Sequence, residues 1–258
     1  MGRDLRSAQY LEALGLESWV LRRPAASIAI AAPPRESPPP APAHVPAPAP
    51  APAPALARPP APGRATDWRA LAEEVAACVR CRLHERRTQT VFGVGDPAAE
   101  LLVIGEAPGA DEDRQGEPFV GRSGQLLNSM LFAAGLPRAT VYIANIIKCR
   151  PPDNRDPLPE EVRCCMPYLH RQIDLLGPRL MLAVGRVAAQ TLLDTDTPIG
   201  KLRGAVHRFG ARNTPLIVTY HPAYLLRSPR EKRRAWDDLR FVRGELARQR
   251  ASTSGASA

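Results

Sequence analysis

A run of alternating proline and alanine divides this chain and limits what its first quarter can fold into. Of the 29 prolines, 15 lie between Pro24 and Pro62. Because proline fixes φ and has no backbone N–H, such a run can neither pair in a sheet nor continue a helix. It predicts an extended, semi-rigid linker over residues 25–65, one globular domain over residues 66–250 and an unstructured tail at 251–258.

The charge of the chain points to a polyanionic partner, since the formal net charge is +9. Lysine and arginine neutralise phosphates and release counterions, so nucleic acid is the first class of partner to consider. A compositional bias toward arginine, without a functional meaning, is the alternative.

No apolar run is long enough to span a bilayer, and the N-terminus lacks the apolar core of a secretion signal. We therefore expect a cytoplasmic protein, in which thiols stay reduced.

Apolar segments and helical segments alternate through the domain. Buried strands are expected at 101–104, 141–147, 180–184 and 216–219, and helices at 123–135, 160–176, 185–193 and 231–248. This order predicts an α/β fold with three α/β/α layers around a central four-stranded parallel sheet. Ligands of such sheets bind beyond the carboxyl ends of the strands. The segment Gly105-Glu-Ala-Pro-Gly, Asn145 and His221 stand at or just after three of these ends, which predicts one site built from three loops.

Four of the five cysteines have the spacing of metal ligands. Cys78 and Cys81 form a C-x2-C pair, and Cys149 and Cys165 bracket a proline-rich loop. Two local pairs that a fold brings together are typical of a four-thiolate site, but the spacing does not separate zinc from a [4Fe–4S] cluster. Cys164 beside Cys165 leaves the fourth ligand ambiguous. Reduced structural cysteines that bind nothing are the alternative.

Several longer motifs resemble those of family-four uracil-DNA glycosylases, the iron–sulfur type. They are Lys148-Cys-Arg-Pro-Pro-Asp-Asn-Arg-Asp-Pro-Leu-Pro with Cys165, Gly105-Glu-Ala-Pro-Gly with Glu112-Asp113, Pro118-Phe-Val-Gly and His221-Pro-Ala-Tyr-Leu-Leu. The resemblance covers roughly residues 75–245. It implies a [4Fe–4S] cluster held by Cys78, Cys81, Cys149 and Cys165, with a structural role.

The same resemblance implies a glycosylase that removes uracil from single- or double-stranded DNA. No lysine stands in a position that suggests Schiff-base lyase chemistry, so we expect a monofunctional enzyme, and we expect a monomer. The product is an abasic site, the starting point of base excision repair. Three alternatives stay open. The fold could serve another deaminated base, it could bind uracil tightly with slow turnover, or the chain could be a non-catalytic four-cysteine nucleic-acid-binding module.

The family resemblance also implies roles for six residues of the expected site. Phe119 stacks on the flipped base, and the carboxamide of Asn145 pairs with the O4 and N3–H edge of uracil. His221 donates a hydrogen bond to O2 and stabilises the departing anion. Glu106 and Asn154 handle the attacking water, and Glu112 lies near C5, where it excludes the methyl group of thymine. The alternatives are a core position for Phe119, a strand-end cap for Asn145 and a structural role for His221. A solvated acidic loop is the alternative interpretation of Glu106 and Glu112.

The residues after His221 suit contact with the DNA itself. Tyr224, Leu225 and Leu226 are expected to fill the gap that the flipped base leaves, and Arg227 with the basic closing helix is expected to contact phosphates. A solvated helix face is the alternative.

Residues 1–24 form a separate amphipathic segment, expected to become ordered on a partner. The segment resembles the N-terminal peptide of the psi subunit of the bacterial clamp loader, in Leu14-Gly15, Trp19 and Leu21-Arg-Arg-Pro24. The resemblance implies binding to clamp-loader subunits with Trp19 as the buried anchor. A chance amphipathic helix is the alternative.

Overall fold

The computed structural model describes residues 68–254, with side chains to residue 252. The segments expected to be an interaction peptide, at 1–24, and a linker, at 25–65, lie outside these residues. The helices are α2 (Trp68–Ala76), α3 (Ala110–Gln115), α4 (Arg122–Ala133), α5 (Pro159–Leu176), α6 (Arg186–Leu193), α7 (Ile199–Leu202), α8 (Pro222–Arg227) and α9 (Lys232–Ser254). Short 3-10 helices are η1 (Arg82–Glu85), η2 (Arg138–Thr140), η3 (Pro152–Asn154) and η4 (Pro229–Glu231).

The strands form one mixed sheet in the order β1-β3-β2-β4-β6-β5. They are β1 (Val94–Gly95), β2 (Leu101–Gly105), β3 (Tyr142–Asn145), β4 (Leu180–Val184), β5 (His207–Phe209) and β6 (Thr214–Thr219). The four central strands are parallel, which confirms the expected core of the sheet. The two outer strands are antiparallel and were missed. Segments of two and three residues are too short to carry a periodic pattern.

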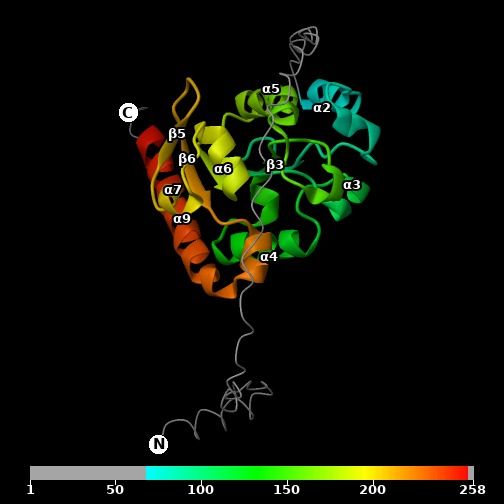
Figure 1. Cartoon of the computed structure of the whole chain (residues 1–258). Coiled ribbons are helices and arrows are strands. Elements are labelled where there is room, and N and C mark those ends of the chain that lie inside the picture. The colour runs from blue at the N-terminus through cyan, green and yellow to red at the C-terminus, as the bar shows by residue number, and fades with distance from the viewer. Residues whose placement is uncertain (1–67, 255–258) are drawn as a thin grey trace, which may run out of the picture. The chain divides into compact units, whose positions relative to one another are not determined.

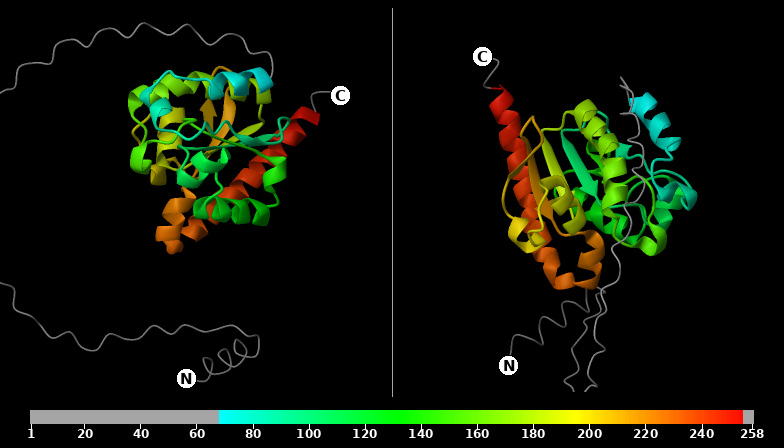
Figure 2. Two further views of the ribbon diagram at one scale, coloured as in Figure 1. Left: turned by 90° about the vertical axis from the view of Figure 1, so that its right-hand side faces the viewer. Right: turned by 45° about the horizontal axis from the view of Figure 1, so that its top comes forward.

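Helices cover both faces of the sheet, so the expected three layers are confirmed (Figures 1 and 2). Strand side chains alternate between the faces. Leu102 and Ile104 of β2 pack in a core with α2, α5 and α6, whereas Leu101 and Val103 pack in a second core with α4 and α9. Central strands buried on both faces read as continuous apolar runs, which is why they were recognisable in the sequence.

The ends of α5 show why the sequence folds locally as it does. Pro159 occupies the first turn, where its missing N–H costs nothing. The Glu161 carboxylate accepts a hydrogen bond from the Leu158 N–H at 2.7 Å and caps the helix. Gly177 ends it with a φ of 56°, a conformation that glycine adopts easily.

The last helix, α9, extends to Ser254, past Arg250, where the sequence placed the end of the domain. Within residues 68–254, no helix combines the length and apolar character needed to cross a membrane.

Candidate active site

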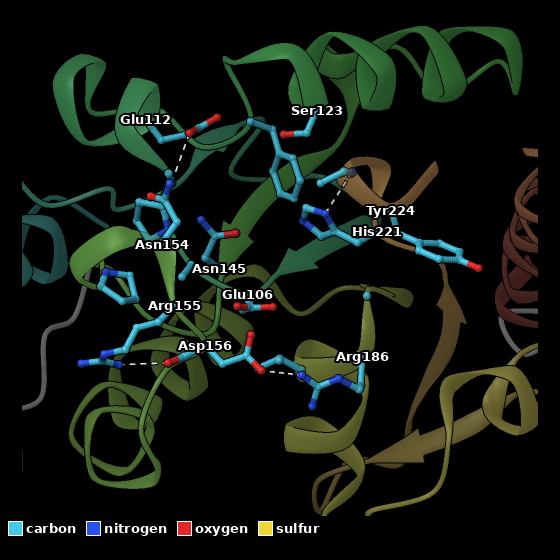
Figure 3. Close-up of a pocket in the computed structure, with 18 of the residues that line it drawn as sticks. Glu106, Glu112, Ser123, Asn145, Asn154, Arg155, Asp156, Arg186, His221 and Tyr224 are labelled. Carbon is cyan, nitrogen blue, oxygen red and sulfur yellow. Dashed lines mark hydrogen bonds and ion pairs between the residues drawn. The ribbon is translucent and has the colours of Figure 1, made fainter. Parts of the chain in front are cut away.

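A pocket of about 810 Å3 lies at the carboxyl ends of the parallel strands (Figure 3). The loops after β2, β3, β4 and β6 supply its walls, as the parallel sheet predicted. All six residues expected to bind substrate or act in catalysis line it: Glu106, Glu112, Phe119, Asn145, Asn154 and His221. The tertiary structure therefore brings together residues that are up to 115 positions apart in the sequence.

Asn145 stands at the end of β3 and is only 2 % exposed. Its Oδ1 atom is buried and has no hydrogen-bond partner among the described residues. Gly105 makes room for it, because a Cβ there would lie 2.5 Å from Oδ1 and 2.6 Å from Cζ of Phe119. A buried acceptor without a partner is costly, so this oxygen is set up to receive a donor from a ligand.

Phe119 lies 5.6 Å from the His221 ring, centroid to centroid, and its backbone has a φ of 55°. Such a conformation is strained for a bulky residue and needs support from its surroundings. Arg138 provides it by donating hydrogen bonds to the carbonyl oxygens of Pro118 at 2.7 Å and Phe119 at 3.4 Å. Gly124 lets the loop pass, since a Cβ there would lie 1.9 Å from the Phe119 carbonyl oxygen.

Glu112 fastens the same loop from the other side. Its carboxylate accepts hydrogen bonds from the backbone N–H groups of Val120 at 2.9 Å, Gly121 at 3.0 Å and Gly109 at 3.1 Å. The side chain is 8 % exposed. The structure thus gives Glu112 a holding function that the sequence did not indicate, joining the loop after β2 to the loop that carries Phe119.

His221 precedes α8, and its Nδ1 accepts a hydrogen bond from the Ala223 N–H at 3.1 Å. In the neutral ring the proton is therefore on Nε2. Burial, helped by the charge of Arg227, lowers the pKa of His221 to about 4, so the ring is neutral near pH 7. Gly185 has a φ of 101° and leaves room for the histidine, because a Cβ added at Gly185 would lie 3.0 Å from the Cβ of His221.

Glu106 directly follows β2. Burial, and after it the carboxylate of Asp156, raise its pKa to about 7, and the guanidinium of Arg186 opposes the rise. Asp156 and Arg186 form an ion pair at the same side of the pocket. The sequence analysis missed both residues, although Asp156 lies within the segment from Lys148 and Arg186 begins the helix after β4.

Asn154 has a φ of 54° and lies in η3. Its Oδ1 accepts a hydrogen bond from the Nε of Arg150 at 2.8 Å, so the amide nitrogen is the donor end of the side chain. Asn154 lines the pocket, and its side chain can donate a hydrogen bond there from the amide nitrogen.

Comparison with known proteins identifies the fold around this pocket. Residues 92–240 match the family model described as the uracil DNA glycosylase superfamily. The chain belongs to that superfamily. It is 43% identical to a type-4 uracil-DNA glycosylase of Archaeoglobus fulgidus over 71% of this chain and 94% of the relative. It is 41% identical to a type-4 enzyme of Thermotoga maritima over 61% and 82%. A type-5 enzyme of Thermus thermophilus is 37% identical over 51% and 68%.

Helix α8 of this superfamily member presents only part of the predicted DNA-contacting surface. Tyr224 and Leu226 are exposed at 36 % and 38 %, and Arg227 is exposed as well. Leu225 is fully buried in a small core with Tyr220 and Ala235. Its prediction as a wedge residue was wrong, because the helix turns successive side chains by about 100° and directs this one inward.

The five cysteines of the glycosylase chain are unpaired and line one small cavity with Arg80, Arg87 and Lys148. Cys149 Sγ accepts a hydrogen bond from Arg87 at 3.1 Å, and Cys165 Sγ accepts one from the Lys148 N–H at 3.3 Å. Two guanidinium nitrogens of Arg80 are buried there and have no hydrogen-bond partner in the described part of the chain. In residues 68–252, no three His, Cys, Asp or Glu side chains converge as ligands of a metal ion.

Proposed function

We propose that the chain is a monofunctional uracil-DNA glycosylase that hydrolyses the N-glycosidic bond of uracil in DNA and leaves an abasic site for base excision repair. The observation that supports it best is the buried Oδ1 of Asn145, which has no hydrogen-bond partner in residues 68–252 and lies, like the Phe119 ring, against Gly105. The membership of the superfamily and the similarity to type-4 enzymes support the same function.

The Asn145 carboxamide fits the polar edge of uracil. Oδ1 would accept from N3–H, and the amide nitrogen would donate to O4. Cytosine has an acceptor at N3 and a donor at C4, so both contacts would become repulsive. Such a site discriminates strongly, because the wrong base leaves buried polar groups unpaired. Phe119 would stack on the face of the base after it is flipped out of the helix.

The hydrolysis needs a nucleophile and a stabilised leaving group. A water oxygen would form the bond to C1′ as the C1′–N1 bond breaks, with the bonding pair leaving on the uracil ring. The water proton would pass to the Glu106 carboxylate, and Asn154 would help to orient the water. Neutral His221 would donate its Nε2–H to O2 of the uracil anion, the placement that electrostatic stabilisation requires.

The function is tested with single- and double-stranded oligonucleotides that contain one uracil. Wild-type protein should yield an abasic product, and Asn145→Ala and His221→Ala should each lower the rate at least ~100-fold while circular dichroism shows intact folding. No abasic product from either substrate would overturn the proposal. Release of hypoxanthine from a substrate that contains this base would support the alternative of another deaminated base. Binding of uracil-containing DNA without cleavage would support the alternative of a non-catalytic binding module.

We further propose that Cys78, Cys81, Cys149 and Cys165 hold a [4Fe–4S] cluster. The donor set fits, because the thiols line one cavity and are accompanied by cationic and N–H donors of the kind that stabilise anionic clusters. The two buried nitrogens of Arg80, for which residues 68–252 supply no hydrogen-bond partner, support the same assignment. When bound, the cluster supplies a crosslink between the domain entrance, the loop after β3 and α5, and takes no part in hydrolysis.

Iron and sulfide analysis tests this cluster. The wild type and Cys164→Ser should contain iron and absorb near ~400 nm, whereas Cys165→Ser should lose both. Colourless protein with zinc would favour the zinc alternative, and equal iron loss in the two variants would contradict the ligand assignment.

The segment at 1–24 lies outside the described residues, so its binding to clamp-loader subunits is proposed from its sequence resemblance alone. A pull-down with peptide 1–24 should retain clamp-loader subunits, and Trp19→Ala should abolish the retention. Failure of the unaltered peptide to retain them would exclude the interaction.

A further inference from the structure

Glu106 lies on the same side of the pocket as Asp156 and Arg186, one negative and one positive side chain. Neither of them is among the residues proposed to recognise the base. Asp156 lies in the loop after η3, and Arg186 is the first residue of α6. They form an ion pair with each other, and all three residues line the pocket. Figure 3 shows the Glu106 carboxyl group between Asn145 and this pair.

Hydrogen bonds of Arg155 hold the loop that carries Asp156 in place. Arg155 donates a hydrogen bond to the Asp156 carbonyl oxygen at 2.9 Å, and two more to the Glu161 carboxylate at 2.9 and 2.6 Å. Glu161 is 3 % exposed and caps α5. Arg186 is held from its own helix by a bond to Gln190 Oε1 at 3.3 Å. The backbone of Asp156 and the guanidinium of Arg186 are thus each held from their own element, and the ion pair joins the two side chains at the rim of the pocket, where they are 62 % and 55 % exposed.

The other acidic, basic and histidine side chains that line the pocket interact with other groups. Glu112 binds three backbone N–H groups, Arg155 binds Glu161, and His221 is neutral. The positive charge of Arg227 helps to lower the pKa of His221. The charges that act on Glu106 are those of Asp156, which raises its pKa, and Arg186, which lowers it.

We propose that Asp156 and Arg186 are positioning residues for hydrolysis, which control by their opposite charges whether Glu106 can take the proton of the attacking water. This inference rests on the proposed function, because it assigns Glu106 that step. Neither residue touches the base. The pair acts on the water side of the site and leaves uracil recognition by Asn145 unchanged.

Two charge-removing variants give opposite predictions in the full-length protein. Asp156→Asn removes the negative neighbour, so Glu106 stays ionised to lower pH and the acid limb of the single-turnover rate should move to lower pH. Arg186→Gln removes the positive neighbour, so the acid limb should move to higher pH. Shifts of about 0.5–1 pH unit correspond to a roughly three- to tenfold change in rate on the acid side.

The exposed pair Arg212 and Asp174, whose nitrogen and oxygen atoms lie 3.5 Å apart, provides matched controls outside the pocket. Asp174→Asn and Arg212→Gln should leave the pH profile unchanged. Shifts of Asp156→Asn and Arg186→Gln in one direction, no shift in either, or equal shifts in the controls would overturn the proposal.

A second readout does not depend on activity. In protein labelled with 13C at glutamate carboxyl groups, the Glu106 signal, assigned by its loss in Glu106→Gln, should titrate at lower pH in Asp156→Asn and at higher pH in Arg186→Gln. If the wild type releases no uracil, the proposed function fails, and this titration still decides whether the pair controls Glu106. An unchanged Glu106 titration in both variants would refute that control.

Discussion

The ammonium group of Lys148 donates a hydrogen bond to the backbone carbonyl oxygen of Asn145 at 2.8 Å. Lys148 is 1 % exposed, and its own backbone N–H reaches Cys165 Sγ at 3.3 Å. One buried residue thus joins the cysteine cavity to Asn145, which we propose to face the base. We therefore expect the position of the Asn145 carboxamide to depend on the packing around the cysteines, although the two cavities have different linings.

Lys148→Met should therefore weaken uracil recognition. The methionine has a similar length but leaves the Asn145 carbonyl without its donor, at a cost of about 1–3 kcal/mol for a buried acceptor. We expect a lower kcat/KM for uracil-containing DNA and a lower melting temperature. Lys201→Met, at an exposed position of α7, is the control and should match the wild type. Wild-type kinetics in Lys148→Met would show that the link carries no function.

Gly105→Ala should block the base pocket directly. The new methyl group would lie 2.5 Å from Asn145 Oδ1 and 2.6 Å from the Phe119 ring, both of which have to move. We expect kcat/KM for uracil excision to fall by about 10- to 100-fold, since a displacement of this size is enough to misalign a substrate. Gly244→Ala in α9 meets nothing within 4 Å and should leave the activity intact. Comparable activity of the two variants would contradict this account of the pocket.

The rate of uracil release should fall as the pH drops through about 7, where Glu106 takes up a proton. His221 should add no second step until the pH approaches 4, because burial keeps it neutral above that value. Single-turnover rates measured against pH test both statements. Glu106→Gln should be slow and almost independent of pH over this range, and a steep acid limb in that variant would assign the titration to another group.

Stability should respond to the same two groups with opposite signs. The folded-state pKa of Glu106, about 7, lies above its ordinary value of 4.5, so its contribution is present below pH 4.5 and is lost as the pH rises through 7. The pKa of His221, about 4, lies below its ordinary 6.5, so its contribution is present above 6.5 and is lost as the pH falls toward 4. Denaturant unfolding of Glu106→Gln should therefore show stability rising more steeply from pH 4 to 6.5 than in the wild type.

Leu225 and Leu226 should separate packing from DNA contact. Leu225→Ala removes a fully buried side chain and should cost about 2–5 kcal/mol of unfolding free energy. Leu226→Ala changes an exposed side chain and should leave stability within about 0.5 kcal/mol. It should lower the activity on double-stranded DNA more than on single-stranded DNA, because only a duplex leaves a gap to fill. Equal losses on both substrates would argue against a wedge at Leu226.

Much of the fold could be predicted because central parallel strands are buried on both faces. Their apolar runs, and the Gly and Pro residues that end the helices, are properties of local sequence. The edge strands β1 and β5 left no such pattern, since each is short and partly exposed. The direction of Leu225 was equally hidden, because it depends on which side of α8 meets Tyr220 and Ala235.

By itself, the sequence determined the order of the layers, the loops that form the site and the residue types available for base recognition. Only the tertiary structure decided how those residues are held: Glu112 on three backbone N–H groups, Arg138 on the carbonyls around Phe119, and Asp156 paired with Arg186 beside Glu106. The physical reason is that hydrogen bonds and charge effects act over a few ångströms in space. Residues distant in the chain come that close only after the sheet has formed.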